Sequence, residues 1–105
     1  MAKKLRKFNL SFDELYVIVT SYLYSSLTEK EIPDKLTSTH IKHFLQNRYP
    51  DADISLATVN SKLEELVKVM GDYEYIVYND IPYGLSLLKE NGKHSVYLEE
   101  LEFED

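Results

Sequence analysis

Four neighbouring polar side chains could read the edges of DNA bases: Thr58, Asn60, Ser61 and Lys62. An asparagine amide can make two hydrogen bonds to adenine, while hydroxyl and amino groups can reach nearby bases or phosphates. Small polar side chains also occur on ordinary solvated helix faces. The group therefore predicts a base-reading helix only if other elements hold it toward a DNA groove.

Two short helices joined by a tight connector would position these side chains, within residues 37–71. Thr37 is a predicted cap of the first helix, and Tyr49-Pro50-Asp51 ends it because a residue before proline avoids helical geometry. Ser55 caps the second helix, whose apolar residues recur every three or four positions up to Gly71, a predicted C-terminal cap. This pattern is typical of a helix-turn-helix whose second helix reads DNA.

A longer apolar helix is expected before this pair, over residues 10–27. Ser11 and Glu14 form a predicted capping box at its start, and the stretch that follows is apolar on most sides. Such a helix packs on two sides, and a dimer interface is one way to supply the second side. A homodimer is therefore expected, through this helix or through the C-terminal strands.

Residues 72–105 change from helical spacing to an alternating pattern rich in β-forming residues. Asn91-Gly92 is typical of a two-residue hairpin turn, which predicts strands near 84–90 and 93–101. A short helix from Pro82 to Gly92 is the competing interpretation.

The register of this hairpin agrees with the positions of its apolar residues. A turn at 91–92 places Leu87 opposite Val96 and Leu85 opposite Leu98. Paired residues share a face, and that face recurs at every second residue, so all four side chains fall on one side. This consistency favours the strands over the helix.

The predicted fold is therefore α+β: a winged helix-turn-helix of three helices followed by an antiparallel β-hairpin or small sheet. At 105 residues the chain is long enough for one domain. We expect residues 1–9 to be a basic N-terminal arm and residues 10–105 to be a single winged-helix domain with an acidic C-terminal end. Ile32 or Leu36 is expected to add a short strand beside the sheet.

The chain is acidic, with a formal net charge of −6, and its charges are unevenly distributed. Residues 1–70 hold nine acids and ten bases, whereas residues 71–105 hold nine acids and two bases. A nucleic-acid-binding protein usually shows a basic face. The N-terminal arm, which carries four bases, is either a frayed terminus or a segment that contacts phosphates.

A second group of residues would hold DNA phosphates. Thr37, Ser38 and Thr39 lie at a predicted helix N-terminus, where backbone N–H groups stabilise an anion. The other predicted phosphate contacts are basic side chains: Lys42, Arg48, Lys89, Lys93, Lys3, Lys4, Arg6 and Lys7. The predicted reading helix has no arginine, although arginine to guanine is the commonest specific contact. We therefore expect weak binding per protomer and a need for a dimer.

Residues 35–66 carry a spaced motif: Lys35-Leu36-Thr37, Tyr49-Pro50-Asp51, Ile54-Ser55-Leu56-Ala57-Thr58-Val59, Leu63 and Leu66. This motif resembles the DNA-binding half of the ferric-uptake-regulator family. In that family a Leu-Thr cap opens one helix, and a Pro-Asp connector leads to the start of the recognition helix. The resemblance implies a winged-helix fold with its recognition helix at residues 55–70.

The sequence departs from that family in three respects. Ala52-Asp53 lengthen the connector, and Asn60-Ser61 replace the usual Tyr-Arg. The sequence also lacks the metal-binding dimerisation domain and any Cys-x-x-Cys pair. The expected fold and the position of the recognition helix therefore carry over, whereas metal sensing does not.

Neither catalysis nor metal binding is expected. His40 and His43 lie three residues apart on one predicted helix face, but a metal would need a further ligand, so these residues and His94 are interpreted as surface histidines. The sequence has no Gly-rich phosphate loop, nucleophile elbow or recognisable catalytic triad. We expect no enzyme activity and no cofactor.

The alternative function is protein binding. Tyrosine is enriched at interfaces, and five tyrosines fall in the predicted sheet region beside the acids: Tyr73, Tyr75, Tyr78, Tyr83 and Tyr97. An acidic winged helix of this kind could be an interaction module or a small phage-type inhibitor that docks on a basic nucleic-acid-binding partner. The same tyrosines could instead simply pack within the sheet.

The position of the charges separates the two functions. DNA binding is favoured if Lys42, Lys62 and Lys93 share a face with the N-terminal arm, and protein binding is favoured if acids crowd that face: Glu64, Glu65 and Glu90. The main expectation is a dimeric transcriptional or plasmid- or phage-type regulator that binds double-stranded DNA.

The expected compartment is the cytoplasm. The sequence has no apolar run long enough to cross a membrane, and its N-terminus lacks the apolar core of a signal peptide. It contains no cysteine, which fits a reducing compartment.

Overall fold

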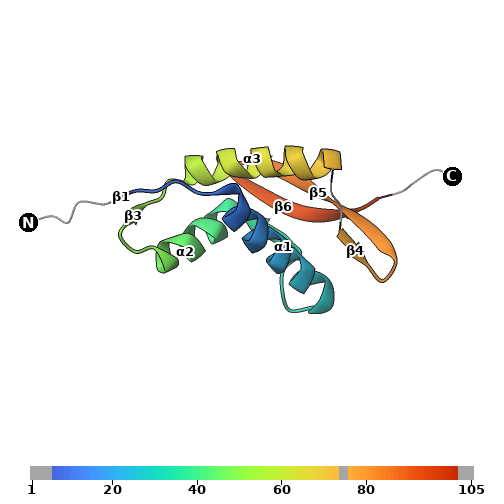
Figure 1. The fold of residues 1–105 in the computed structure, drawn as a ribbon. Coiled ribbons are helices and arrows are strands. Elements are labelled where there is room, and N and C mark those ends of the chain that lie inside the picture. The colour runs from blue at the N-terminus through green and yellow to red at the C-terminus, as the bar shows by residue number, and fades with distance from the viewer. Residues whose placement is uncertain (1–5, 74–75, 102–105) are drawn as a thin grey trace, which may run out of the picture.

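Within residues 6–73 and 76–101, which the computed structural model describes, the chain forms three helices and six strands (Figure 1). The helices are α1 (Phe12–Thr28), α2 (Ser38–Arg48) and α3 (Leu56–Tyr73). The strands are β1 (Arg6–Lys7), β2 (Lys35–Thr37), β3 (Ala52–Asp53), β4 (Ile76–Tyr78), β5 (Ile81–Glu90) and β6 (Lys93–Glu100). The predicted α+β class is confirmed.

Side-chain caps begin all three helices at the predicted residues. The hydroxyl of Ser11 accepts from the Glu14 N–H at 3.1 Å, and that of Thr37 accepts from the His40 N–H at 3.1 Å. Ser55 accepts from the N–H of the third residue after it, also at 3.1 Å. Each hydroxyl satisfies one of the N–H groups that have no partner inside the helix.

Four strands form an antiparallel sheet in the order β2-β6-β5-β4. Strand β2 lies between α1 and α2 in the sequence but pairs with β6, with Leu36 opposite Val96. This confirms the predicted short strand at Leu36. Because β6 bonds to both β2 and β5, it ties the helical part of the chain to the long hairpin.

The β5–β6 hairpin has the predicted register. Leu85 pairs with Leu98 and Leu87 pairs with Val96, so the competing helix over residues 82–92 is wrong. The turn residues Asn91 and Gly92 have φ values of 47° and 77°. This left-handed geometry matches the right-handed twist of the strands and is the reason that Asn-Gly is favoured there.

The end of α3 differs from the prediction. Gly71 lies inside the helix, which continues to Tyr73, so Gly71 is not a left-handed C-terminal cap. Tyr73 therefore belongs to a helix rather than to the sheet, and Tyr75 lies outside the described residues. A second two-residue turn, Asn79-Asp80, with φ values of 52° and 64°, joins β4 to β5.

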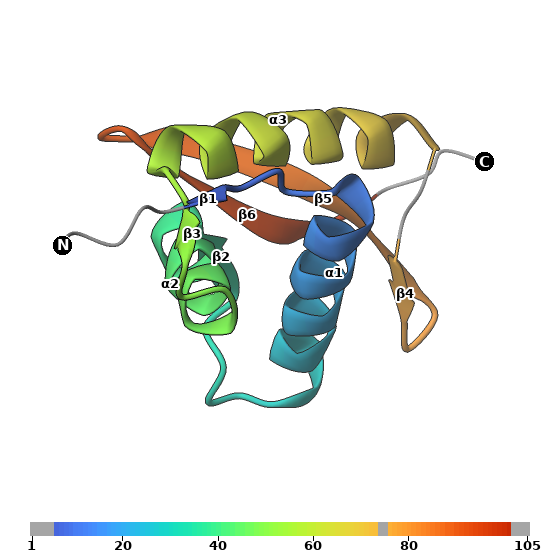
Figure 2. The same cartoon turned by 60° about the vertical axis from the view of Figure 1, so that its left-hand side comes forward.

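One apolar cluster joins the helices to the sheet, and α3 lies along the β5–β6 hairpin (Figure 2). The opposite sheet face, which carries Ser86, Leu88 and Tyr97, is partly exposed. The side chains that are almost completely buried come from every helix and from β2 and β6: Leu15, Val19, Leu23, Leu36, Ile41, Leu45, Val59, Leu63, Leu66 and Val96. Their burial fixes the orientation of each helix and therefore of its outer face.

The N-terminal segment is held against the connector between α2 and α3. Strand β1 pairs in parallel with β3, with Arg6 opposite Ala52 and Lys7 opposite Asp53. The ring of Phe8 lies 5.2 Å from that of Tyr49, centroid to centroid. The described part of the predicted arm is therefore packed, and its interpretation as a frayed end is wrong for these residues. Lys3 and Lys4 lie outside the described residues.

Candidate nucleic-acid interface

The amide of Asn60 joins α3 to the hairpin turn. Its Nδ2 donates to the Gly92 carbonyl oxygen at 2.9 Å, and its Oδ1 accepts from the His94 N–H at 3.1 Å. Both ends of the group that was predicted to bind adenine are thus already paired within the chain. Asn60 acts here as a clamp that sets the hairpin beside the N-terminal half of α3.

Ser38 supports the same junction from α2. Its side chain is completely buried, and its Oγ accepts from the same His94 N–H at 3.1 Å. One backbone N–H of β6 is therefore shared by acceptors from two helices. The backbone N–H groups of Thr37, Ser38 and Thr39 were predicted to hold a phosphate. The Ser38 side chain cannot join them because it is buried, and the Thr37 hydroxyl is used as the helix cap.

An ionic cluster lies beside this junction. A carboxylate oxygen of Glu64 lies 2.8 Å from Lys89 Nζ and 2.9 Å from His94 Nε2. The hydrogen bond from Lys89 is the main cause that lowers the pKa of Glu64, and the hydrogen bond from His94 adds to it. Lys89, predicted as a phosphate contact, therefore already has a carboxylate partner.

Two other basic residues of the predicted DNA-binding set also lie next to a carboxylate. Lys62 Nζ lies 3.3 Å from a carboxylate oxygen of Glu65 on the same helix. Arg48 lies 3.6 Å from the Glu14 carboxylate and 5.7 Å from the centroid of the Tyr49 ring. The Tyr49 hydroxyl donates to Glu14 at 2.6 Å, and this bond is the main cause that raises the pKa of Tyr49. Arg48 thus links α2 to α1.

Several predicted residues remain available around the N-terminal half of α3. Ser61 is exposed, and Lys93, exposed beside the hairpin turn, makes no ion pair within the described residues. Lys42 lies on α2 rather than on α3 and likewise has no ion pair there. Thr58 is partly exposed, and its hydroxyl lies 2.8 Å from the Ser55 hydroxyl. The backbone of β1 brings Arg6 and Lys7 to the connector before α3.

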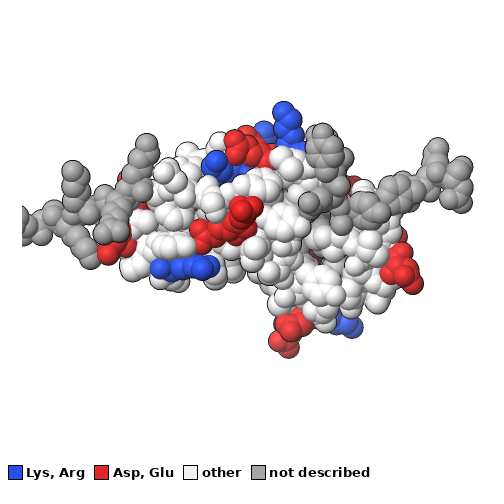
Figure 3. Space-filling view, viewed as in Figure 1, with Lys and Arg blue, Asp and Glu red and all other residues white. Residues whose placement is uncertain are grey.

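The charges on the visible face are mixed rather than basic. In Figure 3, Lys and Arg side chains alternate with Asp and Glu side chains over a largely uncharged surface. On α3 itself, Glu64 is directed to the hairpin cations and Glu65 to Lys62. Acids and bases thus both lie on the surface around α3. The position of the charges therefore does not decide between DNA binding and protein binding.

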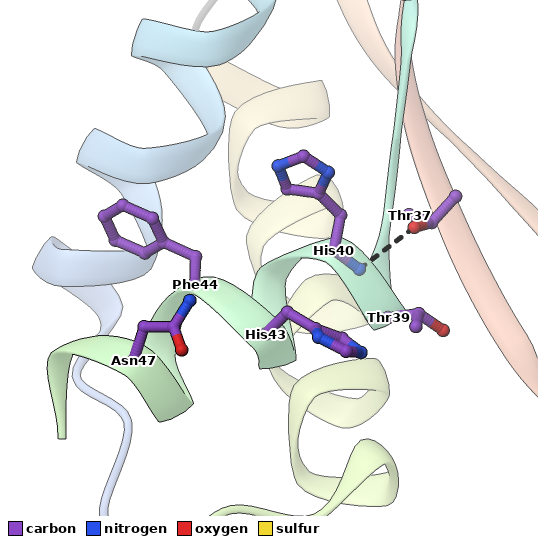
Figure 4. A pocket seen from close by; sticks show the side chains of 6 residues that line it. All are labelled: Thr37, Thr39, His40, His43, Phe44 and Asn47. Carbon is purple, nitrogen blue, oxygen red and sulfur yellow. Dashed lines mark hydrogen bonds between the residues drawn. The ribbon is translucent and has the colours of Figure 1, made fainter. Parts of the chain in front are cut away.

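Sequence reasoning missed a hollow of about 580 Å³ on the outer side of α2 (Figure 4). Phe44, which is 46% exposed, lies in it between polar groups, and His40 packs edge-on against Tyr22 with centroids 5.4 Å apart. Phe44 follows Ile41 at helical spacing, but Ile41 is completely buried and Phe44 is not. The lining residues are Thr37, Thr39, His40, His43, Phe44 and Asn47.

The two histidines of this hollow do not converge on one point. Figure 4 shows the rings of His40 and His43 directed to different sides of α2. Among the residues that the structure describes, no three His, Asp or Glu side chains come together as a metal-binding group. None of the described helices is long and apolar enough to cross a membrane.

No family model, no curated protein and no solved structure matches this chain. The resemblance of residues 35–66 to ferric-uptake-regulator proteins therefore rests on its motif residues alone.

Proposed function

We propose that the chain is a winged-helix protein that binds double-stranded DNA, as a sequence-specific transcriptional or plasmid- or phage-type regulator. The observation that supports this most is the position of the hairpin turn, which Asn60 holds beside the N-terminal half of α3. In helix-turn-helix proteins the N-terminal residues of the second helix contact base edges. A hairpin fixed beside that helix would meet the adjacent DNA backbone.

The exposed residues of this surface have distinct roles in the proposal. Ser61 and the partly exposed Thr58 would contact bases, while Lys62 and Lys93 would contact phosphates. The pair between Lys62 and Glu65 is exposed, and such pairs contribute at most about 1 kcal/mol. A phosphate group can therefore replace the Glu65 carboxylate at low cost. Asn60 keeps its clamping role.

The test is a fluorescence-anisotropy titration of labelled random-sequence duplex DNA at about 50 mM and about 200 mM salt, since counterion release makes non-specific binding strongest at low salt. We expect binding that weakens steeply with salt. The Lys62→Ala/Lys93→Ala variant should bind at least about tenfold more weakly at low salt, because two phosphate contacts are lost.

A charge-matched control separates local contacts from net charge. Lys30 follows α1 and Lys35 lies over the Tyr97 ring, both outside the proposed surface. The Lys30→Ala/Lys35→Ala variant should keep most of the affinity. Equal losses in the two variants, or no binding at the lower salt, would contradict the DNA-binding proposal.

Protein binding is the second candidate, and the pairing of cations with acids favours it. Lys62, Lys89 and Arg48 each face a carboxylate, so few bases are available on a chain whose net charge is −6. Such a surface suits an interaction module or phage-type inhibitor on a basic nucleic-acid-binding partner. A chain that fails to bind DNA at low salt yet binds a basic protein at the same salt would establish this alternative.

A further inference from the structure

We propose that the outer face of α1 binds a second copy of the chain, with the two α1 helices antiparallel across a twofold axis. This interface is separate from the proposed DNA-binding surface and does not depend on it. Three observations support it: an exposed apolar stripe, the absence of charged residues from Leu15 to Thr28, and a spacing of residues that is complementary to itself.

Besides its buried side, α1 has a stripe of exposed residues on its outer side. Leu15, Val19 and Leu23 hold one side of the helix in the core. The outer side presents Val17, which is 58% exposed, and Tyr24, which is 49% exposed. The Tyr24 ring is supported edge-on by Tyr78 at 5.8 Å, so little conformational freedom would be lost when a partner covers it.

Most of α1 carries no charged residue. From Leu15 to Thr28 no residue of α1 is charged, although the chain as a whole carries −6. A twofold contact places the same face of both copies against each other, so a face that carries charges of one sign would repel itself. Figure 3 shows mainly uncharged surface over α1. Between Leu15 and Thr28 this face offers no charge to DNA or to a basic protein, and it therefore suits an identical copy.

The third observation is the spacing along the stripe. An axis placed between Thr20 and Ser21 sets Val17 opposite the partner's Tyr24, because these residues are equally distant from the axis. The small residues at the crossing allow the helices to approach closely. The same axis sets Asp13 opposite the hydroxyl residue Thr28 of the partner, and not opposite another acid.

Two hollows flank the stripe and would receive the larger side chains. One, of about 310 Å³, is lined by Tyr16, Thr20, Ser21, Tyr24 and Ile76. The other, of about 320 Å³, is lined by Asp13, Glu14, Val17, Ile18 and Arg48. In the antiparallel arrangement the partner's Tyr24 lies beside the second hollow, and the partner's Val17 lies beside the first. Each copy thus offers both the projections and the hollows.

The first experiment measures association by sedimentation equilibrium. A single helix pair buries a small area, so the wild-type chain should form a dimer with a Kd of about micromolar order. Val17→Glu should raise that Kd at least about tenfold. Val69→Glu is the matched control, because Val69 is a 44% exposed valine on α3, and it should dimerise as the wild type does. A wild-type chain that stays monomeric at about millimolar concentration, or an unchanged Val17→Glu dimer, overturns the proposal.

The second experiment tests the antiparallel register. Val17→Glu and Tyr24→Lys should each weaken the homodimer, but a mixture should recover a heterodimer because Glu at position 17 meets Lys at position 24 of the partner. The chain has no cysteine, so Ser21→Cys places a single thiol near the axis. Its oxidation should give a disulfide-linked dimer, whereas Val69→Cys should not. No heterodimer and no selective cross-link would refute this register.

Discussion

The surface around α3 and the outer face of α1 differ in how many of their side chains are already bonded within the chain. Beside α3, the polar groups of Asn60, Ser38 and Glu64 are bonded to the hairpin. On α1, Val17 and Tyr24 are exposed, and no residue from Leu15 to Thr28 is charged. Bonded polar groups fix the geometry of the molecule, whereas an exposed apolar stripe is available to a partner. We therefore expect substitutions in the first region to change stability and those in the second to change association.

The largest effect should come from removing both helical acceptors of the His94 N–H. Asn60→Ala or Ser38→Ala alone leaves one acceptor, so each should lower the free energy of unfolding by about 1 kcal/mol. The double variant leaves a part-buried N–H unpaired and should lose about 1 kcal/mol more than the sum of the single losses. Urea unfolding of the four proteins measures this coupling.

Simple additivity in that cycle would show that the two acceptors do not share the N–H in solution. Ser38 is completely buried, so Ser38→Cys serves as a second variant that fills nearly the same space with a thiol, which is a much weaker acceptor. It should also couple to Asn60→Ala. Coupling with one replacement and not with the other would point to a cavity rather than to the hydrogen bond.

A smaller effect, dependent on pH, should come from Glu64. Its pKa in the folded chain lies below the ordinary value of 4.5, since Lys89 and His94 stabilise the carboxylate. The unfolded carboxyl group therefore takes up its proton at a higher pH than the folded one. The stabilisation is complete above about pH 4.5 and is lost as the pH falls through the folded pKa.

Thermal unfolding at pH values from neutral to acid tests this sign. The midpoint of the wild type should fall more steeply below about pH 4.5 than that of Glu64→Gln, which has no carboxyl group to protonate. Lys89→Met, which removes the main stabilising group, should give an intermediate slope. Parallel profiles for all three proteins would show that the ionic cluster contributes nothing measurable in solution.

The smallest effect on stability should come from the α1 stripe. Val17 is exposed, and surface substitutions usually change the free energy of unfolding by no more than about 0.5 kcal/mol. At concentrations where the chain is monomeric, Val17→Glu should therefore unfold almost as the wild type does. A large loss of monomer stability would mean that the stripe packs within its own chain, which would remove the contrast between the two regions.

Local rules predicted much of the fold. Ser11, Thr37 and Ser55 cap their helices because a side-chain oxygen near an unpaired N–H needs only nearby residues. The hairpin register followed from Asn91-Gly92 together with the alternation of apolar residues. The prediction that Gly71 caps α3 was wrong because glycine is also tolerated inside a helix, at a modest cost in stability.

The candidate site was less predictable because its bonds join distant parts of the chain. Asn60 and Ser38 meet His94 only after β6 has entered the sheet, and no local pattern marks either contact. Likewise, the sequence shows the charge of Lys89 but not its pairing with Glu64. Residue type predicted which groups could bind a partner, whereas tertiary structure decided which were already used.

The central position of β6 also has a consequence for the order of events during synthesis. This strand bonds to β2 and to β5, yet it is the last described strand to leave the ribosome. The pairing of β6 with β2 forms slowly, because the long intervening chain must first be closed into a loop, whereas β5 and β6 are joined by a two-residue turn. The three helices therefore emerge before the sheet that covers their apolar sides. Until residues 93–100 are added, the nascent chain exposes leucine and valine side chains, and such surface is prone to aggregation.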